Sequence, residues 1–317
     1  MILVLGASGY FGEAFVRLLT QSKKPFKALS RRELDYSKFN LLLNYLKEMK
    51  PELVVNAAGF TGRPNVDACE TQRAETLLGS VVLGQTVASA CEMTGVTWMQ
   101  LSSGCIYNGA FVKEGDTWRL ETDLTKPEIR ELVETKPDMV AGFKETDDPN
   151  FSFRRPPCSF YSGSKALAEE VLSQFGNGYI VRPRIPFDEH DNARNYLSKI
   201  QRYAKVYDNV NAVSHRGDFA WACLELWLKR APFGTYNVTN PGFVTTRQVV
   251  AKLQKALKLE REFEFFAGDG DFYKVAKAPR SNCLMDVSKL LSTGIKMRSV
   301  DEALDEALAN WRPEKQG

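Results

Sequence analysis

Short apolar runs alternate with segments of helical periodicity from the first residues of the chain onward. Residues 2–5 form one such run, and residues 8–22 carry apolar side chains at helical spacing. The alternation continues through strands expected at 26–30, 51–59 and 96–103 and helices expected at 36–50 and 66–95. Because the connections are short, successive strands must run parallel, with helices crossing over both faces. The pattern predicts an α/β fold with a Rossmann-like doubly wound parallel sheet.

The rest of the chain predicts a second, smaller lobe and one insertion. Helices and short strands continue after residue 156, but less regularly. We expect residues 1–185 to form a nucleotide-binding domain and residues 186–317 to form mainly a C-terminal α/β substrate-binding lobe, with the chain free to cross between them. Residues 113–141 are charged, contain two prolines and break the alternation. They form either a lid or a solvated excursion without a role.

The composition excludes several other classes of protein. A net charge of +3 over 317 residues gives no indication of nucleic-acid or lipid binding. No apolar run reaches the roughly 18 residues that span a bilayer, and the N-terminus lacks the features of a signal peptide. The six cysteines lie far apart without a CxxC pair, which argues against structural zinc and for a reduced compartment. We therefore expect a cytoplasmic protein without a bound metal.

A glycine-rich turn, G-x-x-G-x-x-G, joins the first expected strand to the first expected helix. Glycine lets the backbone approach a pyrophosphate closely, and the helix N-terminus supplies N–H groups and the positive end of its dipole. The motif is short, and a purely structural turn is the alternative. In this strand-turn-helix context it predicts dinucleotide binding by Gly6, Ser8, Gly9, Tyr10, Phe11 and Gly12.

The end of the second expected strand bears on which nicotinamide cofactor is bound. Enzymes that use NAD usually place Asp or Glu there to bind the ribose 2′-hydroxyl. Here the strand ends in Ser30, Arg31 and Arg32; Ser30 and Arg31 suit a 2′-phosphate and favour NADPH, with NADH possible. Glu33 and Asp35 lie nearby and weaken this inference, and the arginines are alternatively solvated surface residues.

Tyr161 and Lys165 stand four residues apart at the start of an expected helix, which places phenol and ammonium on one face. A cation beside a phenol stabilises the phenolate, so we expect the tyrosine proton to transfer more easily at neutral pH. The Y-x-x-x-K spacing is common in helices. It carries weight here because the glycine turn opens the chain and because Ser102 and Ser103 end an expected strand.

These features together resemble the short-chain dehydrogenase/reductase superfamily, extended type. The resemblance implies that Ser103 holds a substrate carbonyl and that Tyr161 donates the proton. It also implies that Lys165 lowers the pKa of the tyrosine and, with it, binds the cofactor at the nicotinamide ribose. Ser102 is the alternative to Ser103. The segment after the third expected strand matches the family loop that borders the cofactor, with residues Asn56, Ala57, Ala58 and Gly59.

Longer segments resemble, in order along the chain, the bifunctional 3,5-epimerase/4-reductase family of nucleotide-rhamnose synthesis, which is related to bacterial dTDP-4-dehydrorhamnose reductases. They are NAAGFTGRPNVDACE, SSGCIY, GFKETDDPNF, FYSGSK, NYLSKIQRY, YNVTNPG and APRSN. They fall within residues 1–110 and 142–310, and the insertion at 113–141 departs from the family.

This closer resemblance implies that Cys105 and Lys199 are the acid/base pair of epimerisation. A ketone at C4 of the sugar acidifies the protons on C3 and C5, and burial and neighbouring charges can tune both side chains toward neutral pKa. Without the resemblance, Cys105 reads as a small buried hydrophobe and Lys199 as a surface residue.

Three further residues are candidates for binding a nucleotide sugar: Arg63, Asn195 and Arg280. Arg280 suits the diphosphate, because a planar guanidinium binds phosphate oxygens bidentately. Arg194 heads the same helix as Lys199 and is a further pocket candidate. Each is alternatively a surface or capping residue. Other notable residues are read as structural: His190 and His215 as loop residues, and Cys69, Cys91 and Cys223 as packing residues.

The expected function is conversion of a nucleotide-linked 4-keto-6-deoxyglucose into nucleotide-linked L-rhamnose, by epimerisation at C3 and C5 and NADPH-dependent reduction at C4. A separate 4,6-dehydratase must then supply the substrate, and a homodimer is one assembly. The alternatives are a 4-reductase without epimerase activity, an epimerase making another deoxysugar, a non-catalytic NADP-binding regulatory subunit and an NADP-sensing transcriptional regulator. The intact Ser103, Tyr161 and Lys165 argue against the last two. The sequence does not distinguish UDP from dTDP as the nucleotide.

Overall fold

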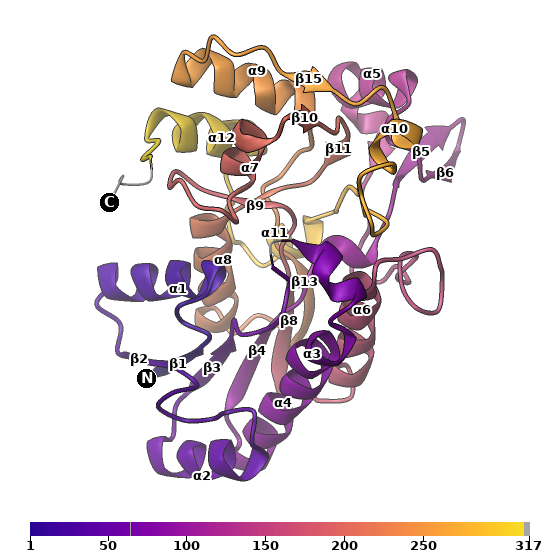
Figure 1. Cartoon of the computed structure of the whole chain (residues 1–317). Helices are drawn as coiled ribbons and strands as arrows, with labels where there is room; N and C mark the ends of the chain where they lie inside the picture. Colours follow the sequence, from indigo (N-terminus) through magenta and orange to yellow (C-terminus); the bar gives the residue numbers. More distant parts are fainter. Residues whose placement is uncertain (64, 314–317) are drawn as a thin grey trace.

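A six-stranded parallel sheet forms the centre of the computed structural model, which describes residues 1–63 and 65–313 (Figure 1). The strand order is β13-β8-β4-β3-β1-β2, and the chain turns back across β1 to reach β3. In such sheets a crevice for ligands forms at the carboxyl ends of the strands on either side of the switch point. The predicted Rossmann-like α/β fold is confirmed. The strands are β1 Ile2–Leu5, β2 Phe26–Leu29, β3 Leu53–Asn56, β4 Thr97–Leu101, β8 Gly178–Arg182 and β13 Gly234–Asn237.

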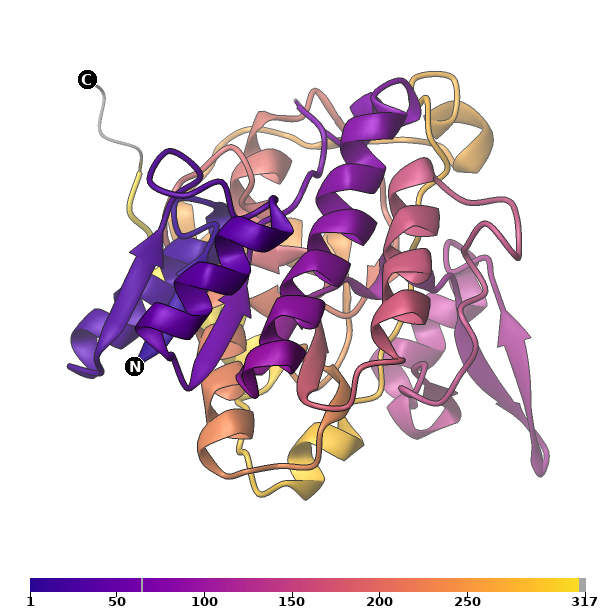
Figure 2. The same cartoon turned by 90° about the horizontal axis from the view of Figure 1, so that it is seen from below.

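Helices cover both faces of this sheet, as the alternating pattern requires (Figures 1 and 2). One face packs against α2, α4 and α6, and the other against α1, α8 and α11, so that each face has its own apolar cluster. In the described part of the chain, no helix combines the length and apolar character that crossing a bilayer requires. The bounds are α1 Tyr10–Gln21, α2 Phe39–Met49, α4 Leu83–Thr94, α6 Phe160–Leu172, α8 Arg216–Leu228 and α11 Ser288–Ser292.

Residues 66–95, expected as one long helix, are divided into four helical pieces. They are a 3₁₀ turn η1 at Val66–Glu70, helix α3 at Arg73–Leu77, a π-helical turn η2 at Leu78–Val82, and α4. Gly79 lies in the π-helical turn, where an added Cβ would be only 2.7 Å from the Cβ of Phe60. The loop after β3 therefore packs directly on this turn. Apolar periodicity did not reveal the breaks, because it reports which face is buried and not how the backbone is wound.

The C-terminal part of the chain builds a smaller lobe above the sheet but also returns to the sheet. Helices α7, α9 and α12 pack around an apolar cluster of their own. Strand β13, by contrast, belongs to the six-stranded sheet, and helices α8 and α11 pack on one face of that sheet. The predicted division near residue 185 thus stays a prediction, with the chain crossing in both directions; residues 314–317 of the expected lobe lie outside the described residues. The elements are β9 Pro186–Phe187, α7 Tyr196–Arg202, β10 Lys205–Val206, β11 Val210–Asn211, β12 Ser214–His215, β14 Val244–Thr245, α9 Thr246–Leu257, β15 Glu264–Phe265, α10 Asp269–Phe272 and α12 Val300–Ala309.

The insertion forms an ordered module on this lobe (Figure 1). A hairpin of two antiparallel strands turns at Gly115, which has a φ of +61°. The module packs apolar side chains against Val210 and Leu284, and Arg130 forms an ion pair of 2.8 Å with Asp208. It is therefore more than a structureless excursion. Its elements are β5 Ala110–Glu114, β6 Thr117–Glu121, α5 Pro127–Thr135, a 3₁₀ turn η4 at Pro137–Met139 and β7 Val140–Ala141.

Candidate active site

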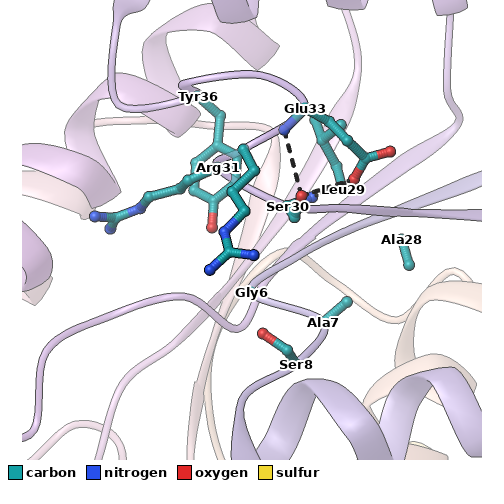
Figure 3. A pocket seen from close by; sticks show the side chains of 10 residues that line it. Gly6, Ala7, Ser8, Ala28, Leu29, Ser30, Arg31, Glu33 and Tyr36 are labelled. Carbon is teal, nitrogen blue, oxygen red and sulfur yellow. Dashed lines mark hydrogen bonds between the residues drawn. The ribbon is translucent and has the colours of Figure 1, made fainter.

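The glycine-rich turn forms one wall of a cavity of about 650 Å³ at the carboxyl end of β1 (Figure 3). Gly6 has a φ of +70°, and a Cβ on it would lie 2.5 Å from the backbone nitrogen of Ala58. Gly9 is the N-cap of α1 and provides no side-chain cap. The N–H groups of the first helical turn are thus free of a side-chain cap and can face a pyrophosphate. The other wall is made by the end of β2 and the residues after it, including Ser30 and Arg31.

The side chains of Tyr10 and Phe11 point away from this cavity, into the packing of α1. The Tyr10 hydroxyl lies 3.4 Å from a carboxylate oxygen of Asp188, and its ring lies 4.1 Å from the guanidinium of Arg216. Phe11 packs its ring against Phe219. For Tyr10 and Phe11, any contact with a dinucleotide would therefore be made by the backbone.

The Asn-Ala-Ala-Gly segment lies between the glycine turn and α6. The Asn56 amide donates to Gln100 at 2.7 Å, which fixes the start of the segment beside β4. Its last residue, Gly59, is so close to α6 that an added Cβ would lie 4.0 Å from Nζ of Lys165. The structure therefore brings this predicted cofactor loop and the predicted active-site lysine together.

Ser102 and Ser103 point to different partners. Ser102 is buried and donates a short hydrogen bond to Glu169, which also forms a buried ion pair with Arg182. Ser103 caps the 3₁₀ turn η3, Gly104–Ile106, by accepting from the Cys105 N–H at 3.2 Å. The Ser103 hydroxyl also lies close enough to Tyr161 to act on the pKa of the phenol, which it lowers. Ser103 is thus the serine that the structure places beside the tyrosine.

Cys105 and Tyr161 lie beside Ser103, Lys165 lies within electrostatic reach of Cys105, and burial dominates the ionisation of all three groups. Burial raises the pKa of the Cys105 thiol, although hydrogen bonds from Ser103 and Ser162 act in the opposite direction. Burial likewise raises the pKa of the Tyr161 phenol above its ordinary value and lowers the pKa of Lys165. The thiol and the phenol therefore both hold their protons at neutral pH.

Burial opposes the predicted easing of the Tyr161 proton by Lys165. The Lys165 ammonium lies 5.7 Å from the centre of the tyrosine ring and donates to the Leu101 carbonyl at 3.3 Å. The i, i+4 spacing placed both groups on one face, as predicted, but the desolvation of the phenol outweighs the nearby cation. Burial thus raises the pKa of Tyr161, and the help of Lys165 in transferring its proton stays a prediction.

Lys199 lies on α7, in the C-terminal lobe, and its ammonium group is flanked by positive charge. Burial, and then the charges of Arg194 and Arg280, lower the pKa of Lys199 below its ordinary value. Arg194 also acts on Tyr161, so Arg194 lies within electrostatic reach of both lobes. Its guanidinium donates to the hydroxyl of Thr61 and to the carbonyl of Gly62, at 3.3 Å for the latter.

The predicted substrate contacts fall in three different settings. Arg280 forms an ion pair of 2.7 Å with Asp67 and remains partly exposed. Arg63 is exposed, and Pro64, within the same motif, lies outside the described residues. Asn195 is fully buried and caps α7, accepting from Leu197 N–H and donating to Asp188 and to the His190 carbonyl.

Asn195 is therefore better described as a capping residue than as a direct substrate contact, since its amide is already saturated by internal hydrogen bonds. This cap explains why the helix of Lys199, expected to include Arg194, begins only at Tyr196. The substrate role of Asn195 remains a prediction that the geometry does not favour.

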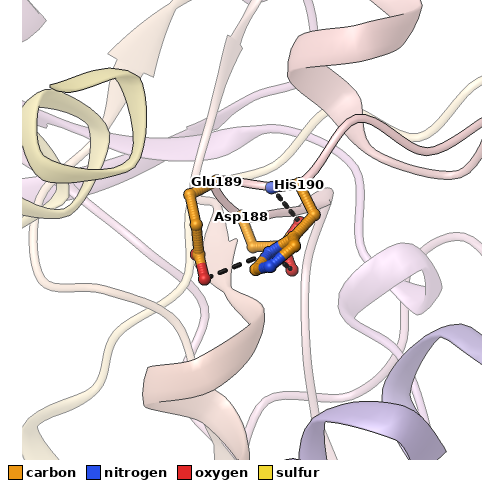
Figure 4. A group of neighbouring side chains, drawn as sticks. All are labelled: Asp188, Glu189 and His190. Atoms are coloured by element: carbon orange, nitrogen blue, oxygen red, sulfur yellow. Dashed lines mark hydrogen bonds and ion pairs between the residues drawn. The ribbon is translucent and has the colours of Figure 1, made fainter. Parts of the chain in front are cut away.

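Asp188, Glu189 and His190 form a compact group whose oxygen and nitrogen atoms lie within 4.8 Å of one another (Figure 4). Asp188 is buried and holds the guanidinium of Arg216, with the Arg216 Nε at 2.8 Å. Through this carboxylate the group joins α1, via Tyr10, to the cap of α7. The observed partners give the group a structural explanation as a junction of the two lobes.

Sequence reasoning missed several residues that shape the site. Glu169 and Arg182 anchor Ser102, and Asp67 holds Arg280. Cys69, read as a packing residue, is buried but lies within electrostatic reach of Cys105 and Lys165. Two features of the sequence could have indicated the ion pair of Arg182 with Glu169: the arginine lies within an expected strand, and the glutamate follows Lys165 by four residues on an expected helix. The ion pairs themselves depend on contacts between distant segments.

Comparison with known proteins places the chain in a defined group. The family model for the RmlD substrate binding domain matches residues 1–312. A trifunctional UDP-glucose 4,6-dehydratase/UDP-4-keto-6-deoxy-D-glucose 3,5-epimerase/UDP-4-keto-L-rhamnose-reductase of Arabidopsis thaliana is 32% identical over 95% of this chain. The chain spans only 40% of the length of that relative.

A shorter relative matches over nearly its whole length. The bifunctional dTDP-4-dehydrorhamnose 3,5-epimerase/dTDP-4-dehydrorhamnose reductase of Arabidopsis thaliana is 31% identical, over 95% of this chain and 90% of the relative. Among solved structures, the L780 UDP-rhamnose synthase of Acanthamoeba polyphaga mimivirus has a TM-score of 0.81 at 22% identity, covering 98% of each chain. This structural likeness supports the fold.

Proposed function

The chain belongs to the RmlD substrate binding domain family of NAD(P)-dependent nucleotide-sugar reductases and epimerases, and we propose that it converts a nucleotide-linked 4-keto-6-deoxyglucose into nucleotide-linked L-rhamnose. The observation that carries this proposal is the convergence of Ser103, Cys105, Tyr161 and Lys165 beside the predicted cofactor loop. At one edge of the sheet, Ser103 supplies a hydroxyl that can hold a substrate carbonyl, Cys105 and Tyr161 supply proton donors, and Lys165 supplies a cation.

In the proposed reduction, Ser103 and Tyr161 hold the C4 carbonyl oxygen of the sugar. NADPH, when bound, supplies the hydride that adds to C4. Tyr161 gives its proton to the oxygen as the C–O double bond becomes a single bond. The raised pKa of Tyr161 fits a donor that is protonated at rest, and the Lys165 cation stabilises the phenolate as it forms.

In the proposed epimerisation, a base removes a proton from C3 or C5 and an acid returns one to the opposite face. The lowered pKa of Lys199 fits a base that is more readily neutral than an ordinary lysine. The raised pKa of Cys105 fits an acid that keeps its proton. For the first inversion, we assign Lys199 as the base and Cys105 as the acid. Before the second inversion, proton exchange between these two side chains, or with solvent, must return Lys199 to the amine and Cys105 to the thiol.

The substrate and cofactor contacts complete the proposal. Arg280, held by Asp67, would bind the diphosphate, with Arg63 near the same edge. We propose NADPH as the cofactor, because Ser30, Arg31 and Arg32 border the cavity beyond the glycine turn. The proposed site performs epimerisation and reduction. A separate 4,6-dehydratase would therefore form the 4-keto substrate upstream.

The direct test is incubation with UDP- and dTDP-linked 4-keto-6-deoxyglucose in D₂O, with and without NADPH, followed by NMR. We expect deuterium at C3 and C5 in both conditions and rhamnose only with NADPH. Reduction without exchange would leave a 4-reductase and overturn the epimerase assignment of Cys105 and Lys199. Exchange and reduction to another deoxysugar would overturn the assignment of product. If neither sugar nucleotide reacted, the chain would share the fold of these enzymes but not this substrate.

A further inference from the structure

The loop after β2 carries its own anion at the place where an anionic cofactor group is expected. The Glu33 carboxylate accepts the Ser30 N–H at 2.9 Å and the Ser30 hydroxyl at 2.8 Å. Its other oxygen takes the ammonium of Lys27 at 3.0 Å. Glu33 and Ser30 both line the cavity that begins at Gly6 (Figure 3). The carboxylate thus uses the two donors of Ser30 that a 2′-phosphate would also use.

We propose that Glu33 is an internal competitor for the 2′-phosphate of NADPH and that it sets the ratio of affinities for NADPH and NADH. This inference rests on the proposed function only in requiring a nicotinamide dinucleotide in this cavity. A 2′-phosphate brings a charge of roughly −1.5 to −2 near neutral pH, as phosphate monoesters do. It must displace the Glu33 carboxylate from Ser30 or bind beside a like charge. NADH, which has only hydroxyls on that ribose, does not meet this repulsion.

Charges of both signs act on a phosphate at this place in the cavity. Arg31 and Arg32 also line the cavity and attract a phosphate, which Glu33 partly offsets. The hydrogen bonds from Ser30 and Lys27 lower the pKa of Glu33 to about 2, so the carboxylate is ionised throughout the neutral range. Neutralising this group therefore changes one charge without changing the arginines.

The test substitutes Glu33→Gln, because glutamine keeps an oxygen that accepts from Ser30 but carries no charge. Binding of NADPH and of NADH is measured separately by titration of nicotinamide fluorescence, without any sugar. A unit charge about 4 Å from a group of charge roughly −1.5 to −2 in a watery environment changes affinity by about 10- to 30-fold. We expect NADPH to bind about 10- to 30-fold more tightly to E33Q and NADH affinity to be unchanged within about twofold. The NADPH gain should shrink at high salt, because the competing charge is exposed and screened.

Asp35→Asn is the matched control, since Asp35 has the same charge but is hydrogen-bonded to Ser37 and does not line the cavity. It should change neither affinity. An unchanged NADPH affinity in E33Q would overturn the proposal. Weaker NADH binding in E33Q, with NADPH unchanged, would identify Glu33 as a ribose ligand and also overturn it. If the unmodified protein bound neither dinucleotide, the proposed function itself would fail, and this inference with it.

Discussion

The two lysines of the candidate site sit in different kinds of structure. Lys165 is 5% exposed on a 13-residue helix packed against the central sheet, whereas Lys199 is less buried on a seven-residue helix of the C-terminal lobe. Burial lowers the pKa of both. Around Lys165, the carboxylate of Glu169 acts to raise the pKa again, but around Lys199 two arginines lower it further.

This difference shows how one residue type serves two tasks. Acidic neighbours help Lys165 to remain a cation, which suits binding and phenolate stabilisation. Positive neighbours make Lys199 a readier base. The proposed epimerisation base thus belongs to the C-terminal lobe, whereas the reduction groups and the proposed epimerisation acid Cys105 belong to the sheet layer.

The largest effect is expected from removing the phenolic hydroxyl with Tyr161→Phe. Loss of a positioned proton donor typically lowers the rate by about 10²- to 10⁴-fold, and reduction of a 4-keto sugar should fall by that amount. Deuterium exchange at C3 and C5 should persist within a few-fold, because Tyr161 is not assigned to that step. Equal loss of exchange and reduction would show that the two steps share the tyrosine.

Cys105→Ala should have the opposite selectivity. Exchange should fall by about 10²-fold, as expected for loss of a general acid. Reduction of a substrate that is already epimerised should stay within a few-fold, and circular dichroism would verify the fold. Cys91→Ala is a suitable control, because Cys91 belongs to α4 and is buried in the apolar cluster on that face of the sheet. Retained exchange would return Cys105 to the role of a small buried side chain.

A smaller effect is expected from Arg194→Gln. Removing this positive charge should raise the pKa of Lys199 toward its ordinary value, so less of the amine is neutral at pH 7. Exchange should fall at neutral pH, because less of the amine is free to act as a base, and should recover as the pH rises. The measurement is the pH profile of deuterium exchange. A uniform loss at every pH would indicate lost positioning of Thr61 and Gly62 instead.

The smallest effect is expected in the insertion. Arg130→Met removes an ion pair with Asp208 but leaves Asp208 paired with Arg247 at 2.6 Å. The free energy of unfolding should fall by about 1 kcal/mol, typical of a partly exposed ion pair, as measured by urea titration. The KM for the sugar nucleotide should not change, because the described contacts of the module are with the C-terminal lobe. A raised KM would favour the lid interpretation.

Much of the fold and part of the site followed from local pattern. The glycine turn, the strand ends and the Tyr161–Lys165 spacing are properties of consecutive residues, and they appear where they were expected. The hairpin of the insertion was missed although Gly115 signals a turn, because its strands are short and charged. The sequence left Asn195 open between a substrate contact and a capping residue, because an exposed polar residue and a buried cap look alike in sequence, and the structure shows the cap.

The sequence by itself determined the strand-helix alternation, and hence the parallel sheet and the edge at which the site lies, because side-chain periodicity and glycine geometry act within a few residues. Only the tertiary structure decided which serine faces Tyr161, since Ser102 is held by Glu169, 67 residues away along the chain. It alone brought Arg194 and Arg280 to Lys199 and placed Glu33 on the donors of Ser30. Burial and charge at a site are sums over all neighbours in space, and neighbours in space are set by packing.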